Sequence, residues 1–472
     1  MASSEVSPYA TTGGLGEVVA SLPPALAALG HDVAVFMPFY RGVREEGAEL
    51  LLRDALPFGD RETAWEVRLI DDAQGWRLYG VRKDEFFDRR HLYGEGDRDY
   101  EDNAERFIFF CRAVLRSIEK LGLAPDILHV HDWQSALLPS LLAARRGPHP
   151  ASLLTLHNLA FQGIFPAARF GLTGLPHEFF GVRGLEFFGQ INLLKGGIVH
   201  ADAVSAVSPT YAREIQTAAM GCGLEGVLSE RPGKVVGILN GIDPSRWDPA
   251  TDTQILETFD ATDLSGKAAC KLALARELGL RLGRLPSPIF AMVARLTPQK
   301  GLDLLLDAIP ELVDLGAKVV VLGSGSAEYE DALRAAAARH KGRMATRIGF
   351  DERLARRIFA GSDFFLMPSF FEPCGLSHMQ AMRYGSIPLV RATGGLDDSV
   401  TGFGPGIAAP NGFKFEGTDP RALIRAAREA IRVFRHPERL TAMRAAAMRA
   451  DFSWSTSARA YESLYSTLAS KA

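Results

Sequence analysis

Residues 289–312 read Ile-Phe-Ala-Met-Val, then Ala-Arg-Leu-Thr-Pro-Gln-Lys-Gly, then Leu-Asp-Leu-Leu-Leu-Asp-Ala-Ile-Pro-Glu-Leu. The first five residues are all apolar, which is typical of a strand buried on both faces of a parallel sheet. The last part places Leu302, Leu305, Leu306 and Ile309 at helical spacing. The stretch therefore predicts a strand, a loop with two cations and a helix, which is the repeating unit of an α/β fold.

Similar apolar runs recur in two series along the chain. The first series is Val33–Met37, Ile127–Val130, Leu153–Leu156, Ala203–Val207 and Val235–Leu239, and the second adds Val319–Leu322, Phe364–Met367 and Ile387–Val390. Continuous apolar strands between helices indicate parallel sheets covered on both faces. We predict an α/β protein of two doubly wound, Rossmann-like domains facing a cleft, one over residues 1–240 and one over residues 250–450.

The length and charge of the chain are consistent with this organisation. The chain has 472 residues, enough for two or three domains, and its 53 Lys and Arg nearly balance its 56 Asp and Glu. Because no excess of positive charge is available for a phosphate backbone, we expect no nucleic-acid partner. No apolar run is long enough to span a bilayer, so we expect no membrane partner either.

The cysteines indicate the compartment. Cys111, Cys222, Cys270 and Cys374 show neither a disulfide framework nor the spacing of a zinc site. The first residues also lack the basic and apolar regions of a signal peptide. We therefore expect a cytoplasmic protein with no metal and no cofactor.

The candidate functional residues follow the predicted strands, because ligands of open α/β sheets bind beyond the carboxyl ends of the strands. The first series is followed by Asp132, by His157 and by Asn240; the second is followed by the loop with Arg295 and Lys300, and by residues 369–375. Polar groups at the strand ends of both domains suggest that the two domains face each other across a cleft.

Each of these residues also has a structural interpretation. Arg295 and Lys300 could clamp a diphosphate or could be solvated surface cations. Glu372 follows two phenylalanines and precedes a proline, so it is either desolvated and paired or functional, and we favour function. Cys374 could be a nucleophile, but a packed thiol is the better interpretation because no base is near it in sequence.

Histidines and glycine turns complete the set. His131 and His157 could be core residues, metal ligands or partners of sugar hydroxyls, and zinc would need more ligands at close spacing. The sequence Thr-Gly-Gly-Leu occurs at residues 12–15 and again at residues 393–396. A glycine turn that opens a helix presents backbone N–H groups to anions.

Taken in order, these motifs resemble those of the bacterial glycogen synthase and plant starch synthase family, GT-B glycosyltransferases that extend α-1,4-glucans from ADP-glucose. The resemblance covers nearly the whole chain. The matching segments are Ser4–Pro8, Gly13–Leu15, His131–Trp133, His157–Gly163, Ala206–Ala212, Asn240–Asp243, Arg295–Gly301, Glu372–Leu376 and Thr393–Leu396.

The resemblance implies a role for each matching residue. Glu372, within the segment that continues through Cys374, Gly375 and Leu376, would lie near the glucosyl group, with His157 and Asp132 as further catalytic-site residues. Arg295 and Lys300 would hold the diphosphate. The remaining substrate contacts would come from Thr11, Gly13, Gly14, Asn240, Thr393, Gly394 and Gly395.

The resemblance also implies the reaction and the domain roles. Glucose would pass from ADP-glucose to the non-reducing end of an α-1,4-glucan such as glycogen, with retained configuration and without a metal. Residues 1–240 would be the acceptor-side domain, completed by a C-terminal helix at about 451–472, and residues 250–450 would bind the nucleotide sugar.

Two departures from the family pattern bear on these expectations. The family has a lysine where this chain has Thr11, which removes a positive charge from the phosphate end of the site. The family also has an apolar strand before the Ser-Glu-Val segment, where this chain begins Met-Ala-Ser-Ser. Either the natural chain starts upstream of Met1 or the central strand of the first sheet is truncated, and in the chain as given we expect neighbouring strand edges to be unpaired. A related GT-B transferase with another nucleotide sugar or acceptor, or a weakly active glucan- or nucleotide-binding relative, therefore remains an alternative.

Overall fold

The computed structural model describes residues 1–44, 46–73, 75–96, 98–283 and 286–470. The chain divides into two compact units. The first unit comprises Met1–Gly241 together with the C-terminal segment from Trp454, and the second unit comprises Ile242–Ser453. Each unit is built on its own parallel sheet, so the α/β prediction is confirmed.

The parallel sheet of the first unit forms from the strands that the apolar runs predict. β7 (Ile127–His131), β8 (Ala151–Leu156), β12 (Ala203–Ala206) and β13 (Val236–Gly237) pair in the order β13-β12-β8-β7. Residues 1–3 lie between β7 and β1 (Val33–Pro38), because Ala2 forms parallel bridges to both Val130 and Phe36. The neighbouring strands are therefore bridged at this position rather than left unpaired.

An antiparallel extension of this sheet corrects the expectation of purely parallel strands. β2 (Glu49–Phe58), β3 (Arg61–Ala73) and β4 (Trp76–Arg82) pair in the order β4-β3-β2, and β4 runs parallel to β1. In β3, buried Trp65 and Val67 alternate with Glu66 and Arg68. Such alternation marks a strand with one solvated face, which a search for continuous apolar runs does not detect.

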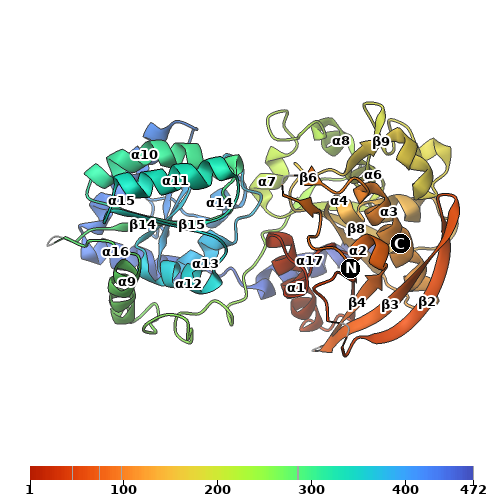
Figure 1. Cartoon of the computed structure of the whole chain (residues 1–472), viewed down its shortest axis with the longest axis horizontal. Helices are drawn as coiled ribbons and strands as arrows, with labels where there is room; N and C mark the ends of the chain where they lie inside the picture. The colour runs from red at the N-terminus through yellow and green to blue at the C-terminus, as the bar shows by residue number, and fades with distance from the viewer. Residues whose placement is uncertain (45, 74, 97, 284–285, 471–472) are drawn as a thin grey trace. The chain divides into compact units, whose positions relative to one another are not determined.

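Helices cover the sheet of the first unit, and the last helix of the chain returns to it. α17 (Trp454–Ala469) packs against α1 (Gly14–Ala27), and Figure 1 shows the two helices together. Its buried side chains include Tyr461 and Leu468. The other elements of this unit are α2 (Asp84–Phe87), β5 (Gly94–Glu95), β6 (Arg98–Asp99), α3 (Asn103–Lys120), α4 (Asp132–Ser135), α5 (Leu137–Ala143), β9 (Ile164–Pro166), η1 (Ala167–Thr173), η2 (His177–Phe179), β10 (Glu186–Phe187), β11 (Gln190–Asn192), α6 (Leu193–His200), α7 (Pro209–Glu214) and α8 (Glu225–Glu230).

The second unit has a fully parallel sheet of order β16-β15-β14-β17-β18-β19. Its strands are β14 (Ile289–Val293), β15 (Lys318–Gly323), β16 (Met344–Ile348), β17 (Phe364–Met367), β18 (Ile387–Arg391) and β19 (Phe413–Phe415). The apolar runs predict the four central strands. β16 and β19 were missed because β16 contains a threonine and an arginine and β19 spans only three residues.

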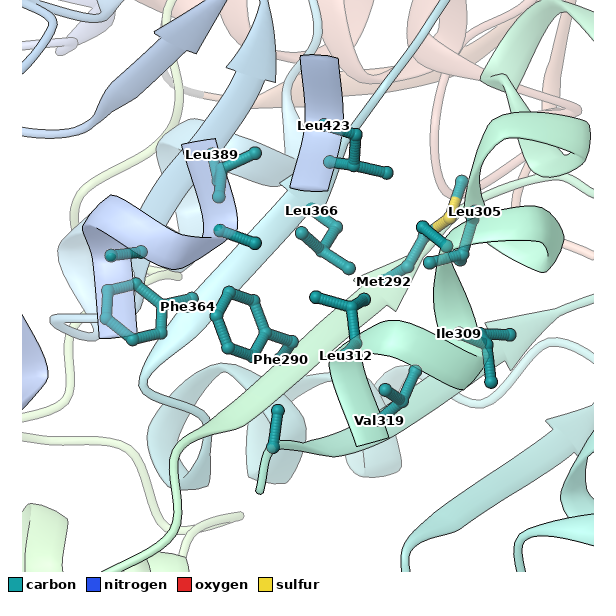
Figure 2. Close-up of a cluster of buried hydrophobic side chains, with 14 of the residues drawn as sticks. Phe290, Met292, Leu305, Ile309, Leu312, Val319, Phe364, Leu366, Leu389 and Leu423 are labelled. Atoms are coloured by element: carbon teal, nitrogen blue, oxygen red, sulfur yellow. The ribbon is translucent and has the colours of Figure 1, made fainter. Parts of the chain in front are cut away.

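Helices lie on both faces of this sheet (Figure 1). They are α9 (Ser265–Glu277), η3 (Pro298–Lys300), α10 (Leu302–Asp314), α11 (Ala327–Arg339), α12 (Glu352–Gly361), α13 (Ser377–Arg383), α14 (Gly394–Ser399), α15 (Pro420–Phe434) and α16 (Pro437–Arg449). Figure 2 shows the core, a cluster that includes Phe290 of β14, Phe364 of β17, Leu312 of α10 and Leu423 of α15. The two phenylalanine rings stack with centroids 4.8 Å apart. This core holds the carboxyl ends of β14 and β17 side by side.

Within the described residues, no helix combines the length and the apolar character that a membrane span requires.

Candidate functional site

A largely buried ion pair joins the loops that follow two neighbouring strands of the second unit. Lys300 Nζ lies 2.6 Å from Glu372 Oε2, and the Ser369 hydroxyl donates to the same oxygen at 3.0 Å. The lysine and glutamate side chains are 12% and 7% exposed. Arg295, on the loop between β14 and η3, is exposed. The structure thus brings together a cation and a carboxylate that the sequence places 72 residues apart.

Backbone contacts fix the position of the Lys300 loop. Gly301 has a φ of 67°, and a Cβ there would lie 2.0 Å from the Pro368 carbonyl oxygen, so only glycine fits. The Phe370 N–H donates to the Gln299 carbonyl at 2.8 Å. These contacts keep the ion pair at the carboxyl end of the sheet, where open α/β sheets bind ligands.

Arg391 also organises this region, and sequence analysis missed it. It is the last residue of β18, and its Nε donates to the Ser369 carbonyl at 2.7 Å, while its Nη2 donates to the Phe370 carbonyl. Arg391 therefore holds the segment that leads into Glu372. Its position at a strand end, two residues before Thr393, is a sequence signal that could have identified it.

The second glycine turn packs directly on the Glu372 segment. Gly394 begins α14 with a φ of 45°, and a Cβ there would lie 1.9 Å from the Glu372 carbonyl oxygen. The Gly395 N–H donates to that oxygen at 3.1 Å and approaches the Pro373 carbonyl oxygen at 3.2 Å. The turn is therefore used to build the site, and the Gly395 amide is already engaged.

The remaining predicted residues of this segment differ in exposure. Cys374 and Thr393 are buried, and burial is the environment of a packed thiol. Gly375 has a φ of 81°, and it and Leu376 are partly exposed at the start of α13. The segment thus runs from buried Glu372 to partly exposed residues at the start of α13.

In the first unit, Asp132 joins the ends of β7 and β8. Its Oδ1 accepts the backbone N–H of His157 at 2.7 Å and that of Asn158 at 3.4 Å. Burial raises the pKa of the Asp132 carboxyl to about 7, and it lowers the pKa of His157 to about 3. His157 is therefore a neutral imidazole at neutral pH, and its Nε2 lies 3.0 Å from Nδ1 of His131.

Asn240 is buried after β13, and its Oδ1 has no hydrogen-bond partner among the described residues. A buried polar atom without a partner costs free energy. An oxygen acceptor is therefore left available at a strand end of the first unit.

The first glycine turn is open. Gly13 caps α1 in an extended conformation, and no atom lies within 4 Å of the position of a Cβ there. Gly14 is the first residue of α1, and Thr11 is exposed with its hydroxyl 3.2 Å from the Gly13 carbonyl oxygen. The turn therefore leaves room for close approach to its backbone.

Glu5, which sequence analysis did not single out as a site residue, holds this turn in place. Its buried carboxylate accepts the Thr12 N–H at 2.6 Å, the Thr12 hydroxyl at 2.7 Å and the Tyr93 hydroxyl at 2.7 Å. Glu5 and Thr12 are seven residues apart, and this spacing alone does not indicate that they form a hydrogen bond.

Comparison with known proteins relates both units to one group of enzymes. Residues 1–230 match the family described as the starch synthase catalytic domain, and residues 283–447 match the family described as glycosyl transferases group 1. A glycogen synthase of Anaeromyxobacter sp. (strain Fw109-5) is 48% identical, over 99% of this chain and 98% of its own. A protein named glycogen synthase 2 of Geobacter sulfurreducens is 44% identical, over 98% of this chain and 97% of its own.

A solved structure extends the comparison to three dimensions. The catalytic domain of starch synthase IV from Arabidopsis thaliana, bound to ADP and acarbose, superposes with a TM-score of 0.91 at 34% identity, over 99% of this chain and 98% of that one. The prediction of the GT-B fold is thereby confirmed. With relatives this similar along its whole length, the chain belongs to the glycogen and starch synthase family of glycosyltransferases.

Proposed function

We propose that this enzyme transfers glucose from ADP-glucose to the non-reducing end of an α-1,4-glucan such as glycogen, with retention of configuration. The observation that carries the proposal is the Lys300–Glu372 pair at the ends of β14 and β17, in a chain of this family. The bound ADP and acarbose of the Arabidopsis relative support an adenine nucleotide and a glucan as ligands.

The second unit supplies charge to the donor. We assign Lys300 and the exposed Arg295 to the diphosphate, because a fixed positive charge stabilises a departing phosphate. Glu372 holds Lys300 in place and lies near the glucosyl group. In a retaining transfer of this kind, the departing phosphate oxygen takes the proton of the incoming hydroxyl, so no separate base is required. Cys374, Gly375 and Leu376, with Thr393, Gly394 and Gly395, form the lining of this site.

The first unit supplies neutral hydrogen-bonding groups. The neutral imidazole of His157 and the open Oδ1 of Asn240 are suited to sugar hydroxyls, which need directional donors and acceptors rather than charge. Asp132 fixes the His157 backbone. The open turn at Gly13 and Gly14 is available to the phosphates or the acceptor end. Accordingly, residues 1–240 with the C-terminal helix form the acceptor-side domain, and residues 250–450 bind the nucleotide sugar.

We place the reaction in the cytoplasm. Cys111, Cys222, Cys270 and Cys374 all lie in the described residues, and all four are free thiols. Free thiols are usual in a reducing compartment.

The donor is tested by measuring nucleoside diphosphate release from ADP-glucose and from UDP-glucose, each with glycogen present and absent. The proposal expects glycogen-dependent release that is faster with ADP-glucose. Faster release from UDP-glucose would identify a transferase with another donor. This alternative is specific to this chain, because Thr11 stands where the family has a lysine. No release from either donor, with glycogen still bound in a sedimentation assay, would identify a binding protein.

A further inference from the structure

A row of aromatic side chains, with His129 and His131 buried at its centre, connects Tyr465 of the C-terminal helix α17 to His157. The Tyr465 hydroxyl lies 2.7 Å from His129 Nδ1, the rings of His129 and His131 lie with centroids 4.1 Å apart, and His131 Nδ1 lies 3.0 Å from His157 Nε2. All of these residues belong to the first unit. Residues from β7, the end of β8 and α17 therefore form one continuous series.

The hydrogen bonds of His129 accommodate a neutral ring with its proton on Nε2. His129 Nε2 lies 2.6 Å from the Thr155 hydroxyl, which in turn lies 2.6 Å from the Ser205 hydroxyl. A neutral imidazole has one donor and one acceptor nitrogen. If the Tyr465 hydroxyl donates to Nδ1, His129 donates from Nε2 to Thr155, and Thr155 donates to Ser205. The hydroxyl protons of Tyr465 and Thr155 then each have an acceptor.

The tautomer of His131 follows from the environment of its other nitrogen. His131 Nε2 is buried and has no partner among the described residues. A proton on Nε2 would be a buried N–H without an acceptor, and such orphaned donors are rarer in proteins than unsatisfied acceptors. The proton therefore belongs on Nδ1, from which it is donated to His157 Nε2. Burial lowers the pKa of both His129 and His131, so both rings stay neutral.

We propose that Tyr465, His129 and His131 are positioning residues that fix His157 as the tautomer with its proton on Nδ1, so that His157 acts as a hydrogen-bond donor. The series makes this donor depend on the docking of α17. The same helix touches a second part of the site, because the Ser457 hydroxyl donates to the Leu239 carbonyl, next to Asn240, at 2.6 Å. That the recipient of the His157 hydrogen bond is a sugar oxygen rests on the proposed function.

The tautomers can be read directly from imidazole ¹⁵N chemical shifts in histidine-labelled full-length protein, with signals assigned by single His131→Asn and His157→Asn variants. We expect Nδ1 to be protonated and Nε2 to be unprotonated in His131 and in His157. Tyr465→Phe, which removes only the hydroxyl, should shift the signals of His129 and His131. A protonated His131 Nε2, or signals unchanged by Tyr465→Phe, would overturn the proposal. This test does not depend on activity, so it remains informative if ADP-glucose is not the donor.

Kinetics provide a second readout. An asparagine amide can place an N–H near the position of His131 Nδ1, whereas leucine has no donor. We expect His131→Leu to lower kcat roughly tenfold or more, because a displaced or inverted His157 misorients its ligand. His131→Asn should restore most of kcat, with the KM for glycogen unchanged in both variants. Equal losses of kcat in the two variants would show that only packing matters and would contradict the proposal.

Glu462→Gln is the matched control on the same helix. It weakens the 3.2 Å pair with His31, another contact that docks α17, and leaves the Tyr465 hydroxyl and the three histidines of the series in place. The His31 ring meets Tyr465 only edge-on, with centroids 6.5 Å apart. If Tyr465→Phe lowers kcat more than Glu462→Gln at equal thermal stability, the effect passes through the histidines. If the two variants lower kcat equally, general loosening of the helix explains the result and the proposal fails.

Discussion

The two units of this enzyme place opposite kinds of chemistry at the ends of their strands. In the second unit, Lys300 and Glu372 form a charged pair at 2.6 Å. In the first unit, Asp132 and His157 lie in surroundings that favour the neutral forms, with the pKa of the acid raised to about 7 and that of the base lowered to about 3. The difference matches the ligands we assign, because a diphosphate needs positive charge and sugar hydroxyls need directional neutral partners.

The two glycine turns differ in how tightly they are packed. Gly394 is packed so tightly that a Cβ would overlap the Glu372 carbonyl oxygen, whereas Gly13 faces open space. Two similar sequences therefore use glycine for different reasons. At Gly394 the glycine allows the backbone of α14 to pack closely against the Glu372 carbonyl oxygen, and at Gly13 it leaves room that we assign to a ligand.

The largest effect is expected at the charged pair. Lys300→Met and Glu372→Gln should each lower kcat by roughly 10² to 10³ with saturating donor, because the fixed charge that stabilises the departing phosphate is lost or misplaced. Each single variant also leaves a largely buried charge without its partner and should lower the unfolding temperature. The double variant should recover stability but not kcat. Wild-type kcat in either single variant would exclude this pair from the reaction.

The neutral character of the first unit should appear in the pH dependence of stability. Because the folded protein keeps a proton on Asp132 up to about pH 7, and the unfolded chain releases it near the usual value of 3.8, stability should fall as pH rises between these values. We expect the loss to be on the order of 4 kcal/mol relative to Asp132→Asn, which keeps an oxygen acceptor and has no charge. The measurement is the free energy of unfolding across this range. Parallel pH profiles for the two proteins would contradict a raised pKa.

The glycine turns can be compared by the same substitution. Gly394→Ala should lower the free energy of unfolding by about 3 kcal/mol, because the residue has a positive φ and the new methyl group would overlap a carbonyl oxygen. Gly13→Ala should change stability by less than about 0.5 kcal/mol, because the site is open. Instead it should raise the KM for ADP-glucose or for glycogen. Equal loss of stability in the two variants, measured by chemical denaturation, would remove the distinction between the turns.

The smallest effect is expected at Thr11. Thr11→Lys adds a positive charge at an exposed position beside the open turn, and should lower the KM for ADP-glucose about fivefold, equivalent to about 1 kcal/mol. Thr11→Gln, of similar reach but neutral, is the control. An unchanged KM in the lysine variant would mean that another cation already serves the phosphates, or that the natural donor is a different nucleotide sugar.

Much of this structure could be predicted from the sequence, because buried parallel strands are continuous apolar runs and their carboxyl ends carry the polar residues. That reasoning predicted Lys300, Glu372, Asp132 and His157 as residues that follow strands, and in the structure they follow β14, β17, β7 and β8. The contacts among these residues were not predicted, because the pairing of Lys300 with Glu372 depends on the conformation of two loops.

The residues that sequence analysis missed share one physical property. Glu5, Arg391 and Tyr465 act through contacts with segments that lie elsewhere in the chain, and no local pattern indicates such contacts. The antiparallel strands β2–β4 were missed for a different reason. Their apolar residues alternate with charged ones, so they form no continuous apolar run.

The most direct test of the account is to follow the transferred sugar itself. The enzyme is incubated with ADP-glucose labelled with ¹³C at the anomeric carbon and a maltooligosaccharide, and the product is analysed by NMR. The account predicts label only in new α-1,4-linked residues at the non-reducing end, with little label in Lys300→Met. Label in free glucose or in a β-linked product, or no labelled oligosaccharide from the wild-type enzyme, would contradict it.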